Sequence, residues 1–568
     1  LSLRFDSVES AARRESMERR SFLKAAATSA AALVFDRRQA LAQQADSHIE
    51  IMVDEPIGTI APEIYGHFTE HLGSVIYDGI YVGENSMIAN QQGLRTALIE
   101  KMRAIKAPVV RWPGGCFADS YDWRDGIGPR DKRPRRTNFW TDNFTPEQQK
   151  QKIPQVYEPN EFGTSDFVRF CKLSGAQPYI AANVRSLTPL DFDHWVEYCN
   201  SPRGTTTLAE TREADGSADP YNVRYWGVGN ESWGCGGNFD PEDYAVEYKR
   251  YTTWVPGYGV KLRFVASGPN SDEQAWTRGF FNKLCHGQPS HDMHGVWGLS
   301  VHHYAWNLSR GKTEDWDAGK GDALKFDPID WYELCKETDR IGGIIMDHWT
   351  ALGEFDLDRK VKLVVDEYGP WYRPGTENAP EQLLGQMITV RDAVMTGMTL
   401  DTFNRNADKV GMAACAQLVN CLNSLFLTHE DKFATTPVFN VFEMYAAHQA
   451  GESLRTEFSV PEVSYDRDGK PATFWGLNGS ASLKGKTLTL TAVNPDVSQP
   501  REAEIVIRGA SAASANAWVV AESDIHAHNT LDQPDQVKTH AASVSVGSKS
   551  LSFTFPPASV AKIEIQIS

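Results

Sequence analysis

The sequence predicts an α/β protein: a (β/α)8 barrel followed by a C-terminal antiparallel β-sandwich. From about residue 60, short apolar runs alternate with longer amphipathic ones. Strands that alternate with helices pair in parallel through right-handed crossovers, and eight such units over roughly 350 residues are typical of a barrel. After about residue 455, apolar and polar residues alternate one by one, which is typical of antiparallel strands.

The eight predicted barrel strands are short, apolar and separated by helical patterns. They span residues 64–68, 109–114, 178–184, 223–230, 262–267, 298–304, 362–367 and 411–418. The clearest helical patterns span residues 93–105, 165–173, 241–254, 331–352 and 381–398. A doubly wound open sheet is the competing architecture, but no Gly-x-Gly-x-x-Gly follows the first strand. We therefore assign residues 59–425 to the barrel.

The sequence of the last part of the chain predicts a separate β domain. Residues 487–491, 504–507 and 550–555 alternate strictly, with Gly, Asn, Ser and Pro between them. The sandwich is expected to span residues 426–568. Residues 48–58 contain a lone strand pattern before the barrel, which we expect to join the sandwich.

Composition narrows the class of ligand. The 568 residues carry a net charge of −17, which disfavours a polyanionic partner such as nucleic acid. The basic run at residues 130–136 contains an acid and a proline, and we interpret it as a solvated loop. Sixteen Trp and nineteen Tyr suit stacking on sugar rings, although most such rings are expected in the core. Eight scattered Cys with no Cys-x-x-Cys pair argue against a zinc module.

Residues 17–42 resemble an export signal, and residues 1–16 are expected to be upstream sequence. Arg19 and Arg20 precede Phe-Leu-Lys, a mildly apolar stretch at residues 25–35 follows, and Ala40-Leu41-Ala42 offers a cleavage site. The alternative is a short N-terminal helix. We expect Met17 to be the start, export by the twin-arginine route, and a periplasmic or secreted protein. No later run approaches 18 apolar residues, so no membrane span is expected.

Two glutamates stand where predicted strands end. The fourth strand run ends in Asn230-Glu231 and the seventh in Asp366-Glu367. Barrel chemistry takes place at the carboxyl ends of the strands, and strands four and seven lie across the barrel from each other. Two facing carboxylates are what glycosidic cleavage needs, one as acid/base and one as nucleophile or base. A separation of about 5–5.5 Å would indicate retention of configuration. The alternative is two salt-bridged surface acids.

Asp366 is the rival nucleophile. Adjacent side chains on a strand point to opposite sides, so only one of Asp366 and Glu367 is expected to face the substrate. Asn230 could donate a hydrogen bond to the sugar hydroxyl next to the reacting carbon.

Five stretches of the sequence resemble glycoside hydrolase family 51, the α-L-arabinofuranosidases. They are IYGHFTEHLG at residues 64–73, RWPGGCFAD at 111–119, WRDGIGP at 123–129, GVGNE at 227–231 and VDEYG at 365–369. The resemblance covers roughly residues 48–568. It implies a barrel with a C-terminal sandwich, a retaining mechanism and a homo-oligomer, often a hexamer.

The resemblance also implies roles for particular residues. Glu231 is the expected acid/base and Glu367 the expected nucleophile, in agreement with the strand-end argument. The residues expected to bind the arabinofuranosyl unit are Glu70, Asn230, Tyr304 and Gln417, and Trp140 and Trp371 resemble aromatic walls around the scissile bond. The expected reaction releases terminal non-reducing α-L-arabinofuranosyl residues from arabinose-containing hemicellulose or pectin.

Cys116 departs from the family pattern, because better-known relatives have Asn at this sugar-contacting position. Cys235 follows Glu231 closely, so both cysteines are expected at the barrel mouth. We hypothesise a disulfide between them; the alternative is two free thiols near the pocket. His302 is expected to orient the nucleophile or a sugar hydroxyl.

No metal and no cofactor are expected. His67 and His71 have the i, i+4 spacing of helical metal ligands, but they flank a strand end. Two further hypotheses stay open. The same machinery could act on another furanoside, a xyloside or a β-glucan, or the chain could be an exported sugar-binding protein without catalysis. A nicotinamide enzyme is disfavoured by the missing glycine loop.

Overall fold

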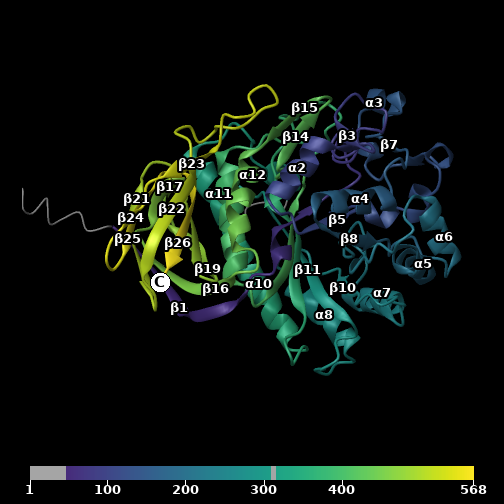
Figure 1. Cartoon of the computed structure of the whole chain (residues 1–568), viewed down its shortest axis with the longest axis horizontal. Helices are drawn as coiled ribbons and strands as arrows, with labels where there is room; N and C mark the ends of the chain where they lie inside the picture. Colours follow the sequence, from purple (N-terminus) through teal and green to yellow (C-terminus); the bar gives the residue numbers. More distant parts are fainter. Residues whose placement is uncertain (1–45, 309–314) are drawn as a thin grey trace, which may run out of the picture.

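The computed structural model describes residues 46–308 and 315–568. The predicted export segment at residues 17–42 lies outside the described residues. The chain forms a barrel and a β-rich domain beside it, visible on the right and left of Figure 1.

Eight parallel strands close into a barrel, as the sequence predicts. In spatial order they are β10, β11, β12, β13, β2, β5, β8 and β9. Their bounds are β2 Gly66–Phe68, β5 Val109–Trp112, β8 Gln177–Ala182, β9 Tyr225–Val228, β10 Arg263–Ala266, β11 Val296–Ala305, β12 Lys362–Pro370 and β13 Val410–Ala416. Each overlaps one of the eight predicted runs. Apolar side chains such as Tyr179, Val265 and Met412 fill the barrel interior below the mouth.

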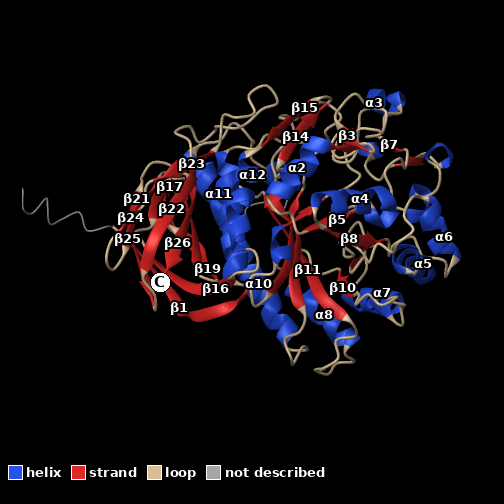
Figure 2. Cartoon of the chain, in the orientation of Figure 1, coloured by secondary structure: helices blue, strands red, loops and turns tan. Residues whose placement is uncertain are grey.

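Helices cover the outside of the barrel (Figure 2). They are α2 Thr96–Ala104, α3 Pro146–Gln151, α4 Thr164–Ser174, α5 Pro189–Asn200, α6 Thr207–Ala214, α7 Pro241–Thr252, α8 Gln274–Leu284, α9 Trp316–Gly319, α10 Pro328–Gly353, α11 Val390–Arg405 and α12 Pro437–Tyr445. Helix α11 begins nine residues later than the predicted span 381–398. The Thr389 side chain accepts from the Arg391 amide, and the Asp392 carboxylate accepts from the Thr389 amide, so this capping box fixes the start.

Short strands and 3-10 turns lie in the loops around the barrel. The small strands are β3 Asn90–Gln91, β4 Leu94–Arg95, β6 Arg136–Thr137, β7 Tyr157–Glu158, β14 Phe426–His429 and β15 Lys432–Thr435. The 3-10 turns are η1 Pro62–Tyr65, η2 Ala118–Ser120, η3 Trp123–Gly126, η4 Arg130–Lys132, η5 Thr141–Asn143 and η6 Ala446–His448. The basic run at residues 130–136 lies in this region. Arg130 pairs with Asp166 and Glu84, and Arg136 with Asp125.

The C-terminal β domain is a mixed sheet rather than a purely antiparallel one. Its order is β23, β22, β26, β20, β19, β16, β1, β21, β25, β24. The N-terminal strand β1 Ser47–Thr59 lies between β16 and β21, antiparallel to the first and parallel to the second. This insertion of a strand from the start of the chain is why the predicted antiparallel pattern is broken at one pair.

The remaining bounds in this domain are β16 Glu452–Ser459, β17 Val463–Arg467, β18 Lys470–Phe474, β19 Asn478–Lys484, β20 Thr487–Asn494, β21 Arg501–Arg508, β22 Ala512–Val520, β23 Thr539–Ala542, β24 Ser545–Val546, β25 Leu551–Phe555 and β26 Ser559–Ile567. Strands β17 and β18 form a separate hairpin. The main sheet encloses its own apolar core, which includes Ile49, Leu490, Ile505 and Phe553.

Helices α11 and α12 lie between the barrel and the β domain (Figure 1). The buried Asp401 on α11 accepts hydrogen bonds from Ser480 on β19 at 2.7 Å, Thr491 on β20 at 2.5 Å and Tyr445 on α12 at 2.8 Å. Burial raises the pKa of Asp401 to about 7, although these hydrogen bonds oppose the shift. A polar cluster therefore joins the two domains within an otherwise apolar contact.

The histidines at positions 67 and 71 occupy separate buried sites. His71 contacts Glu158 through Nδ1 at 2.6 Å and accepts from the Trp112 indole at 2.9 Å. His67 on β2 packs against Phe442, and burial lowers its pKa to about 3. Among the described residues, no helix is both long and apolar enough to cross a membrane.

Candidate active site

Glu231 and Glu367 face one another at the carboxyl end of the barrel. Glu231 follows β9, and Glu367 lies near the end of β12. One carboxylate oxygen of each lies within 4.8 Å of the other and of a ring nitrogen of His302. This is close to the spacing of about 5–5.5 Å at which one carboxylate attacks carbon directly, without room for an intervening water.

A β-bulge in β12 decides how Asp366 and Glu367 point. On β11, Ser300 pairs with Val364 and His302 with Glu367, so three steps on β12 oppose two on β11. The same extra residue appears against β13, between Val365 and Tyr368. A bulge interrupts the alternation of side chains. We expected alternation to point the two acids to opposite sides of β12. Instead, both acids contact Arg111 inside the barrel.

Asp366 is nevertheless kept from the pocket. Its carboxylate accepts from Ser300 at 2.5 Å and Tyr179 at 2.8 Å, and pairs with Arg111. Its side chain is 1% exposed. Burial alone would raise its pKa, but Arg111 and His302 hold that pKa below its usual range. Asp366 is thus a buried, fully engaged anion beneath Glu367.

Glu367 is held by two donors. Arg111 donates to one carboxylate oxygen at 2.7 Å, and the Tyr304 hydroxyl donates to the other at 2.7 Å. Burial alone would lower the pKa of Arg111, but Asp366 and Glu367 raise it above its usual value, so the guanidinium stays charged. Burial also keeps the Tyr304 hydroxyl protonated by raising its pKa. Each oxygen of Glu367 is therefore oriented by a hydrogen bond of its own.

His302 connects the two glutamates. Its Nδ1 lies 2.9 Å from Glu231 Oε1 and 3.6 Å from Glu367 Oε2, while its Nε2 lies 3.3 Å from Asp366. Burial lowers the pKa of the ring, but the three carboxylates outweigh burial and raise it to about 10. His302 is therefore an imidazolium at neutral pH, with both nitrogens donating to carboxylates.

A small cavity of about 70 Å³ opens beside the two glutamates. Nine of the ten residues predicted for the site line it: Glu70, Cys116, Trp140, Asn230, Glu231, Tyr304, Glu367, Trp371 and Gln417. His302 instead lines an adjoining cleft of about 390 Å³, which shares Glu231, Tyr304 and Trp371 with the cavity. Glu231 thus stands at the boundary between a narrow pocket and a wider cleft, whereas Glu367 lines only the pocket.

Glu70 and Gln417 line the cavity and present groups that can hydrogen-bond to sugar hydroxyls. Glu70 accepts from the Phe117 amide at 2.9 Å and from Gln417 Nε2 at 3.2 Å. Burial, with a contribution from the Glu367 charge, raises the pKa of Glu70 to about 7. The buried Gln417 Oε1 has no hydrogen-bond partner among the residues that the structure describes.

The sequence reasoning missed two residues that organise this site. Arg111 contacts Asp366, Glu367 and Asn230, the last at 2.6 Å. Asp119 accepts from the amides of Val184, Arg185 and Asn230. Arg111 could have been found from the sequence, because an arginine within an apolar strand run is unusual. Asp119 lies in a loop, where no local pattern marks it.

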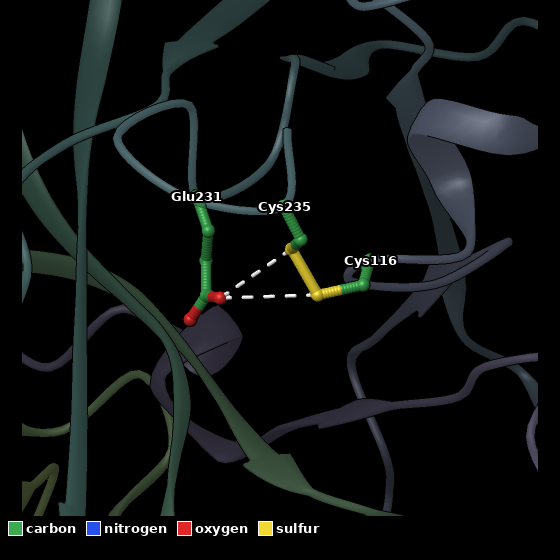
Figure 3. A group of neighbouring side chains, drawn as sticks. All are labelled: Cys116, Glu231 and Cys235. Atoms are coloured by element: carbon green, nitrogen blue, oxygen red, sulfur yellow. Dashed lines mark hydrogen bonds between the residues drawn. A yellow bond between two sulfur atoms is a disulfide. The ribbon is translucent and has the colours of Figure 1, made fainter. Parts of the chain in front are cut away.

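Cys116 and Cys235 form a disulfide at the barrel mouth (Figure 3). The hypothesis of a disulfide is therefore confirmed, and neither sulfur is a free thiol. The remaining six cysteines are buried and unpaired. Cys116 lines the cavity only as half of this bridge, so it has no S–H group to offer a sugar hydroxyl.

An eight-stranded barrel that presents two carboxylates at this separation, beside a cavity with polar groups at its base, defines a retaining glycoside hydrolase. Two family descriptions match the chain: the α-L-arabinofuranosidase 1 domain over residues 101–320 and the α-L-arabinofuranosidase C-terminal domain over residues 366–559. The chain belongs to glycoside hydrolase family 51, the α-L-arabinofuranosidases.

Relatives match nearly the whole chain. It is 34% identical over 531 residues to a protein of Bacteroides ovatus named intracellular exo-α-L-arabinofuranosidase, covering 93% of this chain and 97% of that one. The crystal structure of the family 51 arabinofuranosidase from Xanthomonas axonopodis pv. citri superposes with a TM-score of 0.83 at 32% identity, covering 92% of this chain and all of that one. An arabinose complex of the Thermotoga maritima α-L-arabinofuranosidase superposes with a TM-score of 0.76 at 28% identity, with the same coverage.

Proposed function

We propose that this α-L-arabinofuranosidase releases terminal non-reducing arabinofuranosyl residues by double displacement, with Glu367 as nucleophile and Glu231 as acid/base. The observation that carries the assignment is the pair of carboxylate oxygens within 4.8 Å of each other at the edge of the cavity. Of the two acids on β12, only Glu367 lines that cavity.

In the first step, a Glu367 oxygen attacks the anomeric carbon as the bond to the leaving oxygen breaks. Glu231 donates its proton to that oxygen, so the leaving sugar departs as a neutral alcohol. Arg111 and Tyr304 hold the attacking carboxylate in place through the 2.7 Å contacts. The product of this step is a covalent arabinosyl ester of Glu367.

In the second step, the Glu231 carboxylate takes a proton from water as the water oxygen attacks the anomeric carbon. The ester bond breaks, Glu367 regains its charge, and arabinose leaves with the configuration of the substrate. Exposure suits this exchange, because the Glu231 side chain is 20% exposed and that of Glu367 only 8%. Glu231 is therefore more accessible to water than Glu367.

The shape of the site supports exo action. The cavity of about 70 Å³ beside Glu367 is small, whereas the adjoining cleft of about 390 Å³ is several times larger. Glu70, Asn230 and Gln417 present hydrogen-bonding groups to the ring hydroxyls in the cavity. Trp371 borders both spaces and stacks edge-on against Tyr304, at a centroid distance of 5.1 Å. The cleft is suited to the leaving part of an arabinose-bearing hemicellulose or pectin.

Replacement of each glutamate tests these roles. Glu367→Ala should abolish turnover of aryl α-L-arabinofuranosides, because no ester can form. For Glu231→Ala, kcat/KM should fall far more on substrates with poor leaving groups than on activated ones, because only the former need the acid. NMR of the first product should show the substrate's anomeric configuration. Equal losses on both substrate classes, or the opposite anomer, would contradict the mechanism.

We also propose export by the twin-arginine route. The Arg19-Arg20 pair before an apolar stretch supports it. A disulfide at the barrel mouth supports it too, because such bonds persist in oxidising compartments and are rare in the cytosol. The Bacteroides ovatus relative, by contrast, is named intracellular.

Cell fractionation tests this proposal. Arg19→Lys/Arg20→Lys should leave the activity in the cytoplasm of a bacterial host that has the twin-arginine system, while the unchanged chain reaches the periplasm. Arg37→Lys/Arg38→Lys is the matched control, because this second arginine pair follows the apolar stretch. Cytoplasmic activity for the unchanged chain would overturn the proposal.

A further inference from the structure

The Cys116–Cys235 disulfide touches the proposed acid/base. Glu231 Oε2 lies 3.6 Å from the Cys235 sulfur and 3.9 Å from the Cys116 sulfur. Figure 3 shows the carboxylate directed at the sulfur–sulfur bond. The two cysteines are 119 residues apart, and their bond joins the loop after β5 to the loop after β9.

The loop that carries Glu231 is rich in glycine, and its Ser232 amide donates to Ser267 Oγ at 3.0 Å. It contains Gly234, Gly236 and Gly237, and its amides fold back onto the Glu231 carbonyl at 2.7 Å from Gly234 and 3.2 Å from Gly236. Glu231 itself has a φ of 40°, a left-handed conformation that the surrounding structure must hold in place for a residue with a side chain. Asp119 anchors the preceding Asn230 amide at 3.1 Å. The disulfide anchors the other end of the turn to the same β5 loop.

The two oxygens of Glu231 have different surroundings. Oε1 lies 2.9 Å from His302 Nδ1, which is a donor because the ring is an imidazolium. Oε2 faces two sulfurs that carry no hydrogen and therefore cannot donate a hydrogen bond. A thiol or hydroxyl in their place would donate to Oε2 and favour the charged carboxylate. Oε2 is thus the oxygen that would carry the proton in the proposed acid role of Glu231.

We propose that the Cys116–Cys235 disulfide is a positioning pair for Glu231. It ties the glycine-rich turn so that Glu231 stays beside Glu367, and it keeps hydrogen-bond donors away from the oxygen that carries the catalytic proton. This inference rests on the proposed acid/base role of Glu231 and deepens it.

Two double variants separate the two parts of the proposal. Cys116→Ala/Cys235→Ala removes the tie without adding a donor. Its loss of kcat/KM on poor leaving groups should exceed its loss on activated leaving groups by roughly tenfold or more. Cys116→Ser/Cys235→Ser adds hydroxyl donors. It should show the same selective loss and should also move the alkaline limb of the pH profile of kcat/KM to lower pH. Assays below the measured melting temperature of each variant exclude loss by unfolding.

The Glu231→Ala background shows whether the disulfide acts through Glu231. In that background, removing both cysteines should cause no further loss of kcat/KM on poor leaving groups. A further tenfold loss there, or equal losses on poor and activated leaving groups, would overturn the inference and leave a merely structural bridge. If Glu231→Ala itself did not distinguish leaving groups, the proposed role of Glu231 would fail instead.

Reduction of the folded enzyme gives a measurement that does not depend on a variant folding. A dithiol such as dithiothreitol gives two electrons and two protons to the disulfide, which becomes two thiols while the dithiol closes its own disulfide ring. The reduced enzyme should lose activity selectively on poor leaving groups and regain it on reoxidation. The double Ala variant should not respond, because its six other cysteines are buried and already unpaired. An equal response of that variant would overturn the inference.

Discussion

The Glu367 carboxylate receives one hydrogen bond from a charged donor and one from a neutral donor. Arg111 also binds Asp366 and Asn230, so one guanidinium fixes three groups at the barrel mouth. The Tyr304 hydroxyl donates to Glu367 and to no other residue among the hydrogen bonds that the structure describes. Tyr179 makes the equivalent bond to Asp366 one layer lower, at 2.8 Å. These two tyrosines offer a direct comparison of the two acids on β12.

Tyr304→Phe should lower kcat/KM by roughly tenfold to a hundredfold, because a hydrogen bond to a charged group contributes about 1.5–3 kcal/mol. Steady-state kinetics on an aryl arabinofuranoside measure the loss. Tyr179→Phe is the matched control and should lower activity far less, because Asp366 does not line the cavity. A larger loss from Tyr179→Phe would favour Asp366 as the nucleophile.

The proposed catalytic groups are placed by the ends of strands and by the loops that follow them. The bulge in β12 turns both acids inward. The loop after β5 packs a glycine directly against the proposed nucleophile, since a Cβ added at Gly115 would lie 2.8 Å from Glu367 Oε1. The loop after β9 carries Glu231 and is tied to the β5 loop by the disulfide. These neighbouring elements therefore set the distance between the two carboxylates.

Gly115→Ala should lower kcat/KM by roughly tenfold or more, because the added methyl group must displace a carboxylate that two donors hold in place. Gly343→Ala on α10 is the control, since an added Cβ there meets nothing within 4 Å. It should keep full activity and raise stability by up to about 1 kcal/mol through helix propensity. Unchanged activity in Gly115→Ala would show that the β5 loop can move enough to accommodate the added methyl group.

The two domains of the molecule are joined by a polar contact that depends on pH. Asp401 is fully buried between α11, α12 and the β domain, and its pKa is about 7 in the folded protein against an ordinary value of 3.8. A carboxyl group whose pKa is raised by folding stabilises the folded state most when it is protonated. That contribution is complete below about pH 4 and is lost as the pH rises to about 7.

Asp401→Asn should therefore change the pH dependence of stability. Between pH 4 and 7, the stability of the unchanged protein relative to the variant should fall by on the order of 1 kcal/mol per pH unit, and above pH 7.5 the difference should be constant. Thermal unfolding of both proteins at several pH values measures this difference. Parallel curves at every pH would show that Asp401 keeps its ordinary titration in the folded protein.

The sequence by itself determined the eight barrel strands and the position of the two glutamates at their ends. The reason is local: hydrophobic periodicity shows each strand, and the polar residue that closes a strand must lie at the barrel mouth. It also indicated the β-rich C-terminal domain. The start of α11 was predicted nine residues early, because the capping box at Thr389 and Asp392 stops a pattern that periodicity would extend.

Only the tertiary structure decided which acid on β12 reaches the cavity, how one arginine holds three partners, and that Cys116 bonds to Cys235. Each depends on residues far apart in the chain: Arg111 and Glu367 are separated by 256 positions, and the two cysteines by 119. The bulge in β12 appears only in its pairing with both neighbouring strands. Such contacts arise when eight crossovers bring the loops to one end of the barrel, and no local pattern of residues records them.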